Sequence, residues 1–465
     1  MATAANRFQH LVEEQTQGVS VSARVVIIGG GFAGLTAGVR LSERGYKATV
    51  LERRGHLGGR AYSFIDQKTG DVVDNGQHLF MGCYHHTIDF LKTIGRLDRL
   101  KFQERPRVDF LDREGFASFD CPPLPAPLNV LAGLFRMKGL GAGDKLRALN
   151  LRHAIKTNGR FSPDSLTVDE WLGQLGQSDR IKTRFWYPMV IATLNQSPRI
   201  ASARMLQVVL KEAFGGDSRS ANIGISRVGL SDLYTDGASD FIKSRGGEVQ
   251  TNAQVQQLVI ERGAAVAVEL KDGERIEADN FIGAVPPSAL FAILPDELKN
   301  DEFASLEKLG SSPIVSINLW FDRPITDREF VGLLGTRSQW LFNKDLIVST
   351  GKRSNQIAVI ISAARDFVDW TRNDLVEMAV SELHELLPES RTADVRHSVI
   401  VKEREATLSH TVESDNLRPC PRTSIPNLIL AGDWTKTGLP ATIESAVMSG
   451  DLAAGMVESA QSQIT

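Results

Sequence analysis

Short apolar runs set between polar turns open the chain and predict parallel strands. Residues 25–28 form a β-branched run that ends at glycines, which indicates a buried strand. Helical spacing follows over residues 35–44, and Gly45 stands where helices commonly end on glycine. Residues 47–51 then predict a second strand. A strand, a helix and a second strand in this order are typical of an α/β unit.

Apolar runs later in the chain extend this sheet and add a second one. Shorter runs predict strands at residues 254–260, 264–270, 275–278, 281–285 and 427–431. Longer runs predict strands at residues 314–321, 357–363 and 395–401, with a helix at residues 374–387. We therefore expect an α/β fold with a doubly wound, Rossmann-like nucleotide-binding domain. Beside it we expect an α+β substrate domain built on an antiparallel sheet plus helices.

This pattern predicts a division of the chain into non-contiguous parts. The nucleotide-binding domain is expected from residues 23–85, 225–290 and 411–465, and the substrate domain from residues 86–224 and 291–410. Residues 1–22 are polar and contain no apolar segment, so we expect a frayed leader and not a signal peptide. No apolar run reaches the roughly 20 residues that a membrane-spanning helix needs.

The glycine-rich turn after the first strand predicts a dinucleotide site. It has the form G-x-G-x-x-G, and its residues are Gly29, Gly31, Phe32, Ala33 and Gly34. The first glycine permits a tight turn, the second lets the backbone approach a pyrophosphate, and the third lets the helix pack on the strand. The N-terminus of that helix suits a phosphate because its N–H groups are unpaired. Glu52, at the end of the second strand, is placed to accept hydrogen bonds from ribose hydroxyls.

Composition narrows the remaining classes of function. The chain has 465 residues, of which 42% are apolar and 23% are charged, as is ordinary for a soluble globular protein. A net charge of −3 gives no reason to expect nucleic acid as a partner. Cys83, Cys121 and Cys420 lie far apart without the spacing of metal ligands. We therefore expect no metal site, and a reducing compartment such as the cytoplasm.

The stretch after Glu52 identifies the dinucleotide by resemblance. It reads RRGHLGGR and includes Arg53, Gly58, Gly59 and Arg60. Taken alone, it is equally a basic, flexible turn after a strand. With the glycine motif it resembles the extended FAD fingerprint of the amine oxidase and phytoene desaturase superfamily, in which the paired glycines and the arginine run along the flavin phosphates. The resemblance implies a FAD-binding domain of the glutathione reductase and amine oxidase type, in which Val255 meets the adenine end through its backbone.

The C-terminal end adds to this resemblance. Gly432 and Asp433 follow a predicted strand, and Pro440, Ala441 and Thr442 precede a predicted helix. In the superfamily the aspartate hydrogen-bonds the ribityl and phosphate region of the flavin, and the positive end of the helix stabilises charge on the reduced ring. No cysteine is placed to bond the flavin, so FAD is expected to bind non-covalently.

Residues 71–86, DVVDNGQHLFMGCYHH, contain the candidate catalytic residue. Gly76, Gln77 and His78 follow a segment with turn chemistry. His78 is open to two interpretations. It is either a packed, hydrogen-bonded histidine beside a tight turn or, with Gln77, a residue near the flavin that donates a proton as a general acid. The stretch DNGQHLFMGCY resembles the hydroxysqualene dehydroxylases, a bacterial branch of the superfamily.

Two middle segments also leave alternatives open. Between Leu128 and Arg160 there are apolar positions at helical spacing and seven basic residues, with Asp144 as the single acid. The segment 121–160 suits contact with an anionic membrane, at about 1 kcal/mol per basic residue, or a helical subdomain with a solvated basic face. Residues 185–203 resemble the part of the branch that helps enclose the substrate. Each of their aromatic residues alone is equally compatible with a core.

The narrower resemblance implies a reaction and its partners. It implies reductive dehydroxylation of hydroxysqualene to squalene, in squalene and hopanoid biosynthesis, with FAD as the hydride donor. The expected partners are hydroxysqualene or a similar C30 isoprenoid, an anionic surface on the inner face of the plasma membrane, and pathway enzymes of the squalene synthase kind.

Three alternative functions remain open. They are a carotenoid or phytoene-type desaturase, a soluble FAD amine oxidase, and a flavin-free prenyl-lipid carrier of the GDP-dissociation-inhibitor kind. The intact glycine motif, Glu52 and Asp433 argue against the carrier. The amine oxidase is disfavoured because no lysine can be matched to the one that supports oxygen reaction in that class.

Overall fold

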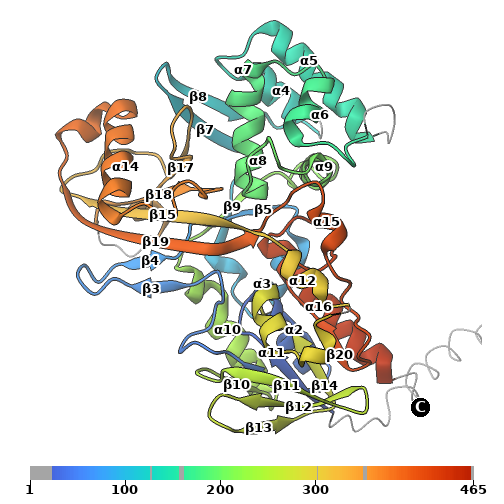
Figure 1. The fold of residues 1–465 in the computed structure, drawn as a ribbon. Coiled ribbons are helices and arrows are strands. Elements are labelled where there is room, and N and C mark those ends of the chain that lie inside the picture. Colours follow the sequence, from blue (N-terminus) through green and yellow to red (C-terminus); the bar gives the residue numbers. More distant parts are fainter. Residues whose placement is uncertain (1–22, 126–127, 157–161, 301, 349–352, 462–465) are drawn as a thin grey trace, which may run out of the picture.

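The structure of the protein, a computed structural model, describes residues 23–125, 128–156, 162–300, 302–348 and 353–461. These residues form two neighbouring regions, one around a five-stranded sheet and one around a seven-stranded sheet (Figure 1). The leader expected at residues 1–22 lies outside the described residues.

The first region is built on a parallel sheet. Its strands, in spatial order, are β10 (Glu248–Gln250), β2 (Lys47–Leu51), β1 (Arg24–Ile28), β14 (Asn280–Gly283) and β20 (Leu428–Leu430). Val25 and Ile27 pack with the helices of one face, which are α2 (Phe32–Glu43), α10 (Leu230–Ser244) and α16 (Ile443–Gln461). Val26 and Ile28 pack on the opposite face. Because both faces of the sheet are covered, the consecutive residues 25–28 of β1 are all apolar.

A small antiparallel sheet covers that opposite face. Its strands are β11 (Val255–Glu261), β12 (Ala264–Leu270) and β13 (Arg275–Glu277), close to the predicted positions. Leu258 and Val268 from this sheet share a core cluster with Val26 and Ile28 of β1. All these strands come from stretches expected to build the nucleotide-binding domain. The domain boundaries themselves stay a prediction.

The second region is built on a seven-stranded sheet. Its order is β19 (Val395–Leu408), β15 (Ser311–Phe321), β18 (Gln356–Ile361), β17 (Trp340–Asn343), β16 (Phe330–Leu333), β7 (Arg107–Asp112) and β8 (Gly115–Asp120). The expected antiparallel arrangement is correct except between β16 and β7, which are parallel. The β7–β8 hairpin joins from a distant part of the chain, so no tight turn fixes its direction. Helix α14 (Arg372–Leu386) packs against one face.

Helices beyond the β7–β8 edge complete this region (Figure 1). They include α4 (Leu128–Arg136), α5 (Ala142–Lys156), α6 (Val168–Gln174), α8 (Tyr187–Leu194) and α9 (Ala203–Phe214). A π-helical turn, Lys182–Trp186, leads directly into α8. Among the described residues, no helix has both the length and the apolar character needed to cross a bilayer.

Two elements differ from the predicted bounds. Helix α2 begins at Phe32, earlier than the expected residue 35, because the end of the glycine motif forms its first turn. Strand β19 runs to Leu408, beyond the expected residue 401, because its charged residues stay paired with β15 as far as Ser311. Periodicity misses both extensions, since neither glycine nor charged residues give an apolar signal.

Candidate active site

The glycine motif packs against neighbouring backbone. Gly29 has a φ of +115°, and a Cβ atom there would lie 2.5 Å from the Ala284 carbonyl oxygen. A Cβ atom on Gly34 would lie 1.9 Å from the Gly29 carbonyl oxygen. Backbone atoms therefore exclude side chains at both positions, in agreement with the roles predicted from the motif.

A second glycine loop faces the first. Gly58 and Gly59 have positive φ angles of +116° and +56°, and the Gly58 N–H donates to the Gly30 carbonyl at 2.9 Å. A Cβ atom on Gly31 would lie 3.7 Å from the Cα atom of Gly59. The two loops thus present adjoining backbone without intervening side chains, which is the surface that a pyrophosphate needs.

Tyr234 of α10 holds the second loop and was missed by sequence reasoning. Its hydroxyl lies 2.8 Å from the Gly58 carbonyl oxygen and 2.9 Å from that of Ala61. Its ring stacks on Phe32 with centroids 3.6 Å apart. Burial raises the pKa of Tyr234, so the phenol stays protonated and donates to the loop. No local signal in the sequence links this tyrosine to a loop 176 residues away.

Glu52 points its carboxylate into the same site. The residue is 6% exposed. Its Oε2 accepts from the Gly30 N–H and its Oε1 from the Arg54 N–H, both at 2.9 Å. These two bonds fix the carboxylate, and each oxygen keeps a lone pair for a ribose hydroxyl. The placement fits the role predicted for Glu52.

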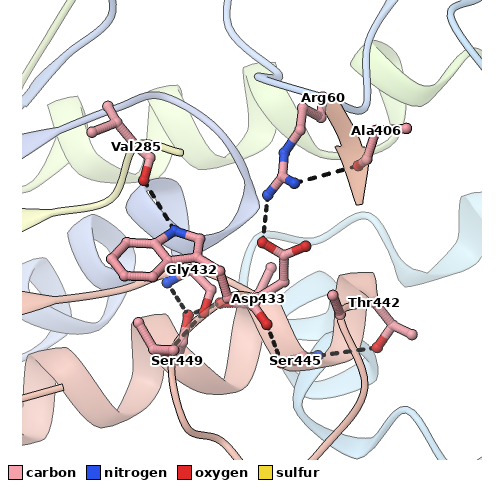
Figure 2. Close-up of polar contacts among 12 residues, drawn as sticks. Arg60, Val285, Ala406, Gly432, Asp433, Thr442, Ser445 and Ser449 are labelled. Carbon is pink, nitrogen blue, oxygen red and sulfur yellow. Dashed lines mark hydrogen bonds and ion pairs between the residues drawn. The ribbon is translucent and has the colours of Figure 1, made fainter. Parts of the chain in front are cut away.

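The C-terminal motif meets the second glycine loop through an ion pair (Figure 2). Asp433, after β20, pairs with Arg60, and Arg60 also donates to the Ala406 carbonyl oxygen at 3.3 Å. Gly432 has a φ of +145°, and its N–H donates to Ser449 Oγ at 2.7 Å. Two predicted cofactor residues that lie 373 positions apart in sequence are therefore brought into contact.

The buried side chains of Arg418 and His410 hold the loop between Asp433 and α16. Neither residue was predicted to do so. Arg418 donates to the carbonyl oxygens of Asp433, Thr435 and Leu439. His410 accepts the Ala441 N–H on Nε2 at 2.7 Å. Burial, with the charge of Arg418 as a smaller cause, lowers the pKa of His410 to about 3, so this histidine is neutral.

The turn formed by Gly76, Gln77 and His78, the GQH turn, is hydrogen-bonded on one side to the second glycine loop. The Asn75 side chain donates to the Arg60 carbonyl oxygen at 3.0 Å. His78 Nδ1 lies 2.8 Å from the Gly76 carbonyl oxygen, which can only accept, so we assign the proton to Nδ1. Burial lowers the pKa of His78, against the opposite effects of that carbonyl and of Asp74. At neutral pH the imidazole is uncharged, with Nε2 as an acceptor.

Glu52, the two glycine loops, Asp433 and His78 line one cavity of about 600 Å³, whose other part is an apolar chamber. Its wall includes Phe110, Phe119, Phe185, Met189, Val209, Phe214, Trp340, Phe342 and Ile360. Phe185, Met189 and Thr193 are spaced four residues apart, so the π-helical turn and α8 present them on one side. The segment expected to enclose a substrate therefore contributes to the wall.

Asn195 lines this chamber and connects it to the seven-stranded sheet, a role that the sequence did not predict. It ends α8 in the left-handed conformation, with a φ of +48°. Its amide nitrogen donates to the Ser312 carbonyl oxygen and to Thr407 Oγ1, both at 3.0 Å, and its oxygen accepts the Ala363 N–H. One buried side chain thus joins the end of α8 to strands β15 and β19 and to the segment that follows β18.

The structure brings nearly all predicted cofactor residues to this cavity. Those in its lining are Gly29, Gly31, Phe32, Ala33, Glu52, Arg53, Gly58, Gly59, Arg60, Gly76, Gln77, His78, Val255, Gly432, Asp433, Ala441 and Thr442. Gly34 and Pro440 are outside the lining, Gly34 because it packs beneath Gly29. Within the described part of the chain, no group of histidine, cysteine or acidic residues could hold a metal ion.

The residues present fit FAD. The adjoining backbone of Gly31 and Gly59 suits the pyrophosphate, and Glu52 suits the adenosine ribose. Asp433 and Arg60 follow along the same cavity. The N-terminus of α16 begins after Thr442, whose Oγ1 accepts the Ser445 N–H at 3.3 Å (Figure 2). This N-terminus adds a partial positive charge that favours a reduced, anionic flavin.

Comparisons with known proteins agree with this cofactor. Solved structures show the same fold. An oxidoreductase from Methanosarcina mazei has a TM-score of 0.72 at 18% identity and covers 93% of this chain and 100% of its own. A redesigned putrescine oxidase has a TM-score of 0.71 at 15% identity, covering 94% and 99%.

Sequence relatives are similar over most of their length. A hydroxysqualene dehydroxylase from Rhodopseudomonas palustris is 30% identical over 443 residues, which are 94% of this chain and 99% of the relative. A 15-cis-phytoene desaturase from Glycine max is 28% identical over 449 residues, covering 92% and 78%. Residues 32–457 match the family described as flavin containing amine oxidoreductase. The chain therefore belongs to this family and is a FAD-dependent oxidoreductase.

Proposed function

We propose that the protein catalyses the reductive dehydroxylation of hydroxysqualene to squalene. The observation that carries this proposal is the cavity that runs from Glu52 and the glycine loops to an apolar chamber, with the polar pair Gln77 and His78 in its wall. Such a chamber suits a C30 chain, because each buried CH₂ group contributes about 0.8 kcal/mol without polar contacts. The similarity to hydroxysqualene dehydroxylase from R. palustris supports the same reaction.

The proposed reaction exchanges a C–O bond for a C–H bond. The hydroxyl gains a proton and leaves as water, and a delocalised carbocation remains on the isoprenoid. Reduced FAD, when bound, supplies the hydride that completes the C–H bond and is left oxidised. Alcohol and reduced FAD thus give hydrocarbon, water and oxidised FAD. Phe185 and the other apolar side chains of the wall exclude water that would trap the cation.

His78 is the proposed proton donor. Its Nδ1 is engaged by the Gly76 carbonyl oxygen, so Nε2 is the atom that gains and loses a proton. Because burial lowers the pKa of His78, the imidazolium is scarce at neutral pH but is a stronger acid than a free one. This assignment predicts faster proton donation as the pH falls.

A phytoene-type desaturase is the second candidate, and a specific observation favours it as well. Relatives include 15-cis-phytoene desaturases, and an apolar chamber also suits a long polyene. A desaturase removes a hydride from a hydrocarbon and needs a base, which the neutral Nε2 of His78 can supply. The dehydroxylase therefore reduces its substrate and the desaturase oxidises it, while both would use His78 and the same apolar chamber.

Product analysis in both directions tests the proposal. The enzyme with reduced FAD is incubated without oxygen with hydroxysqualene, and the enzyme with oxidised FAD is incubated with phytoene. Squalene from the first mixture and unchanged phytoene in the second are expected. The reverse pattern would replace the dehydroxylase by the desaturase.

We also propose that α4 and the first half of α5 contact an anionic membrane. Leu134, Met137 and Ala148 are buried, so part of the predicted apolar stripe is core. Other large apolar side chains of the same segment are exposed, namely Leu124, Leu128, Phe135, Leu146 and Leu149. Arg136, Lys138 and Arg147 are exposed among them. Exposed apolar side chains among cations suit the interface of an anionic bilayer, from which an isoprenoid could be taken.

A further inference from the structure

Behind the GQH turn lies a buried ammonium group. Lys344, in the short helix α13 (Lys344–Ile347), is 4% exposed. Its Nζ donates to Asp74 Oδ2 at 2.6 Å and to Gln77 Oε1 at 2.9 Å. Asp74 ends β4 (Val72–Asp74) and Lys344 follows β17, so this contact joins the segments that carry the cavity residues Gln77 and Phe342.

The partner carboxylate is itself held in place. Asp74 Oδ1 accepts from Ser63 Oγ at 2.7 Å and from the Leu230 N–H at 3.1 Å. Burial by itself raises the pKa of Asp74, but the charge and hydrogen bond of Lys344, with these two donors, bring it below the ordinary value. Asp74 is therefore an anion with both oxygens satisfied, and Lys344 is fixed between it and Gln77.

This contact determines which way the Gln77 amide points. An ammonium group donates hydrogen bonds and accepts none, so the atom of Gln77 next to Lys344 must be the oxygen. The NH₂ group of Gln77 then remains for the cavity that this residue lines. None of the described residues accepts a hydrogen bond from that nitrogen. A donor in a largely apolar cavity is costly unless a ligand pairs with it.

The neighbouring His78 has the opposite polarity. Its neutral imidazole keeps Nε2 as an acceptor, because Nδ1 carries the proton toward the Gly76 carbonyl. A donor from Gln77 and an acceptor from His78 together match an alcohol, whose oxygen accepts one hydrogen bond and whose O–H donates another. A hydrocarbon matches neither group.

We propose that Lys344 is a positioning residue that presents the Gln77 NH₂ group to the hydroxyl oxygen of an isoprenoid alcohol, so that the cavity prefers an alcohol to the corresponding hydrocarbon. The inference rests on the proposed function for the identity of the alcohol. Lys344 then affects specificity without touching the substrate, because it holds the Gln77 carboxamide in one orientation.

A binding measurement tests this inference without turnover. Hydroxysqualene and squalene are titrated into the FAD enzyme in its oxidised state, which has no hydride to give, and flavin fluorescence reports binding. The wild-type enzyme should bind hydroxysqualene about tenfold more tightly than squalene, as expected for one or two buried hydrogen bonds. Gln77→Leu should lower the ratio at least threefold, since only the acceptor on His78 then remains for the hydroxyl.

Variants of the ion pair separate positioning from folding. Lys344→Met alone leaves Asp74 buried and unpaired, so the charge-free pair Asp74→Asn with Lys344→Met is used beside it. Both should lower the ratio at least threefold while FAD stays bound. Lys182→Met is the matched control, because Lys182 is 7% exposed, lies 2.6 Å from Asp169 and is outside the cavity lining. It should keep the wild-type ratio.

Two results would overturn the inference. One is an unchanged ratio in Gln77→Leu and in the double variant. The other is an unchanged ratio with altered FAD affinity and flavin absorbance, which would make a flavin carbonyl the acceptor for Gln77. Absence of squalene formation by the reduced wild-type enzyme would count against the proposed function alone, since the binding ratio does not depend on turnover.

Discussion

At one end of the cavity the groups that face a ligand are backbone atoms and a strand-end carboxylate, and at the other end they are side chains. The nucleotide end uses Gly31, Gly59 and Glu52, which lie within 30 residues of one another. The apolar end draws Phe110, Phe185 and Trp340 from three separate parts of the chain. A cofactor shared by many enzymes is thus bound by a local motif, whereas substrate choice depends on assembly of the whole fold.

The same contrast holds for polar groups. Near the nucleotide end the polar groups are held by several hydrogen bonds within the protein, as for the Glu52 carboxylate, which accepts from two backbone N–H groups. In the chamber they are few, and Gln77 and His78 keep one free nitrogen each. Changes at the two ends should therefore have different signatures, one in FAD binding and the other in rate and selectivity.

The largest expected effect is at His78. His78→Ala should slow reoxidation of the reduced flavin by hydroxysqualene about 10²–10⁴-fold, the usual loss for a general acid, while FAD stays bound. Stopped-flow absorbance in the absence of oxygen measures this rate. His85→Ala is the control because His85 is exposed and outside the cavity lining. A wild-type rate in His78→Ala would make His78 a structural residue.

The pH profile sharpens the same assignment. Since the pKa of His78 is below its ordinary value of 6.5, the protonated fraction grows as the pH falls from 8 to 6. The wild-type rate should rise as the pH falls, by at most about tenfold per pH unit, if proton donation limits it. His78→Ala should show a flat profile. A wild-type rate that rises with pH would contradict the role of acid and favour that of base.

Glu52→Ala should act at the nucleotide end only. It removes charge-assisted hydrogen bonds to the ribose, worth about 1.5–3 kcal/mol each, and should weaken FAD binding about 10–150-fold per bond. Fluorescence titration of the apoprotein measures this change. Once saturated with FAD, the variant should retain the wild-type preference for hydroxysqualene over squalene. A loss of that preference would show that the two ends are not independent.

His410 should make stability depend on pH. Its pKa is about 3 in the fold and 6.5 in the unfolded chain, so the unfolded state binds the proton first as the pH falls. The contribution of His410 should leave the free energy of unfolding unchanged above pH 7 and lower it by about 2 kcal/mol at pH 5. His410→Gln keeps an acceptor for the Ala441 N–H and should remove this contribution. Urea unfolding at the two pH values gives the comparison, with His85→Gln as control.

The smallest expected effect concerns the membrane surface. Arg147→Gln should weaken binding to anionic vesicles by about 1 kcal/mol, because one cation near the surface is lost. Sedimentation with phosphatidylserine vesicles measures it, and added salt should weaken binding of the wild type too. Equal binding of the wild type to neutral and anionic vesicles at low salt would exclude an electrostatic contact.

Residues whose contacts lie close in the sequence could be predicted, whereas residues whose partners are distant in the sequence could not. Gly29, Gly34 and Glu52 were predictable because a strand, a turn and a second strand contain their whole geometry within one continuous stretch. Tyr234 and Lys344 were not, since their partners are 176 and 270 residues away. Only the folded chain shows that a lysine of one region meets a carboxylate and an amide of the other.

Residue types also carry unequal information about roles. The type and position of His78 predict an acid, and the structure adds the contact of Nδ1 with the Gly76 carbonyl oxygen and the burial that lowers its pKa. The buried His410 gave no such signal, although it holds the Ala441 N–H. In α4, Leu134 is core whereas Leu128 and Phe135 are exposed, and periodicity alone does not separate these two faces when both are apolar.

The central claim is that the flavin hydride is transferred to the carbon from which the hydroxyl group of an isoprenoid alcohol has left as water. It is tested most directly by a single turnover in D₂O without oxygen, where reduced FAD carries deuterium at its exchangeable N5 position. One deuterium per squalene, at the carbon that bore the hydroxyl, with oxidised flavin in equal amount, is the predicted result. Flavin that stays reduced in the presence of hydroxysqualene, or squalene without deuterium, would contradict the account.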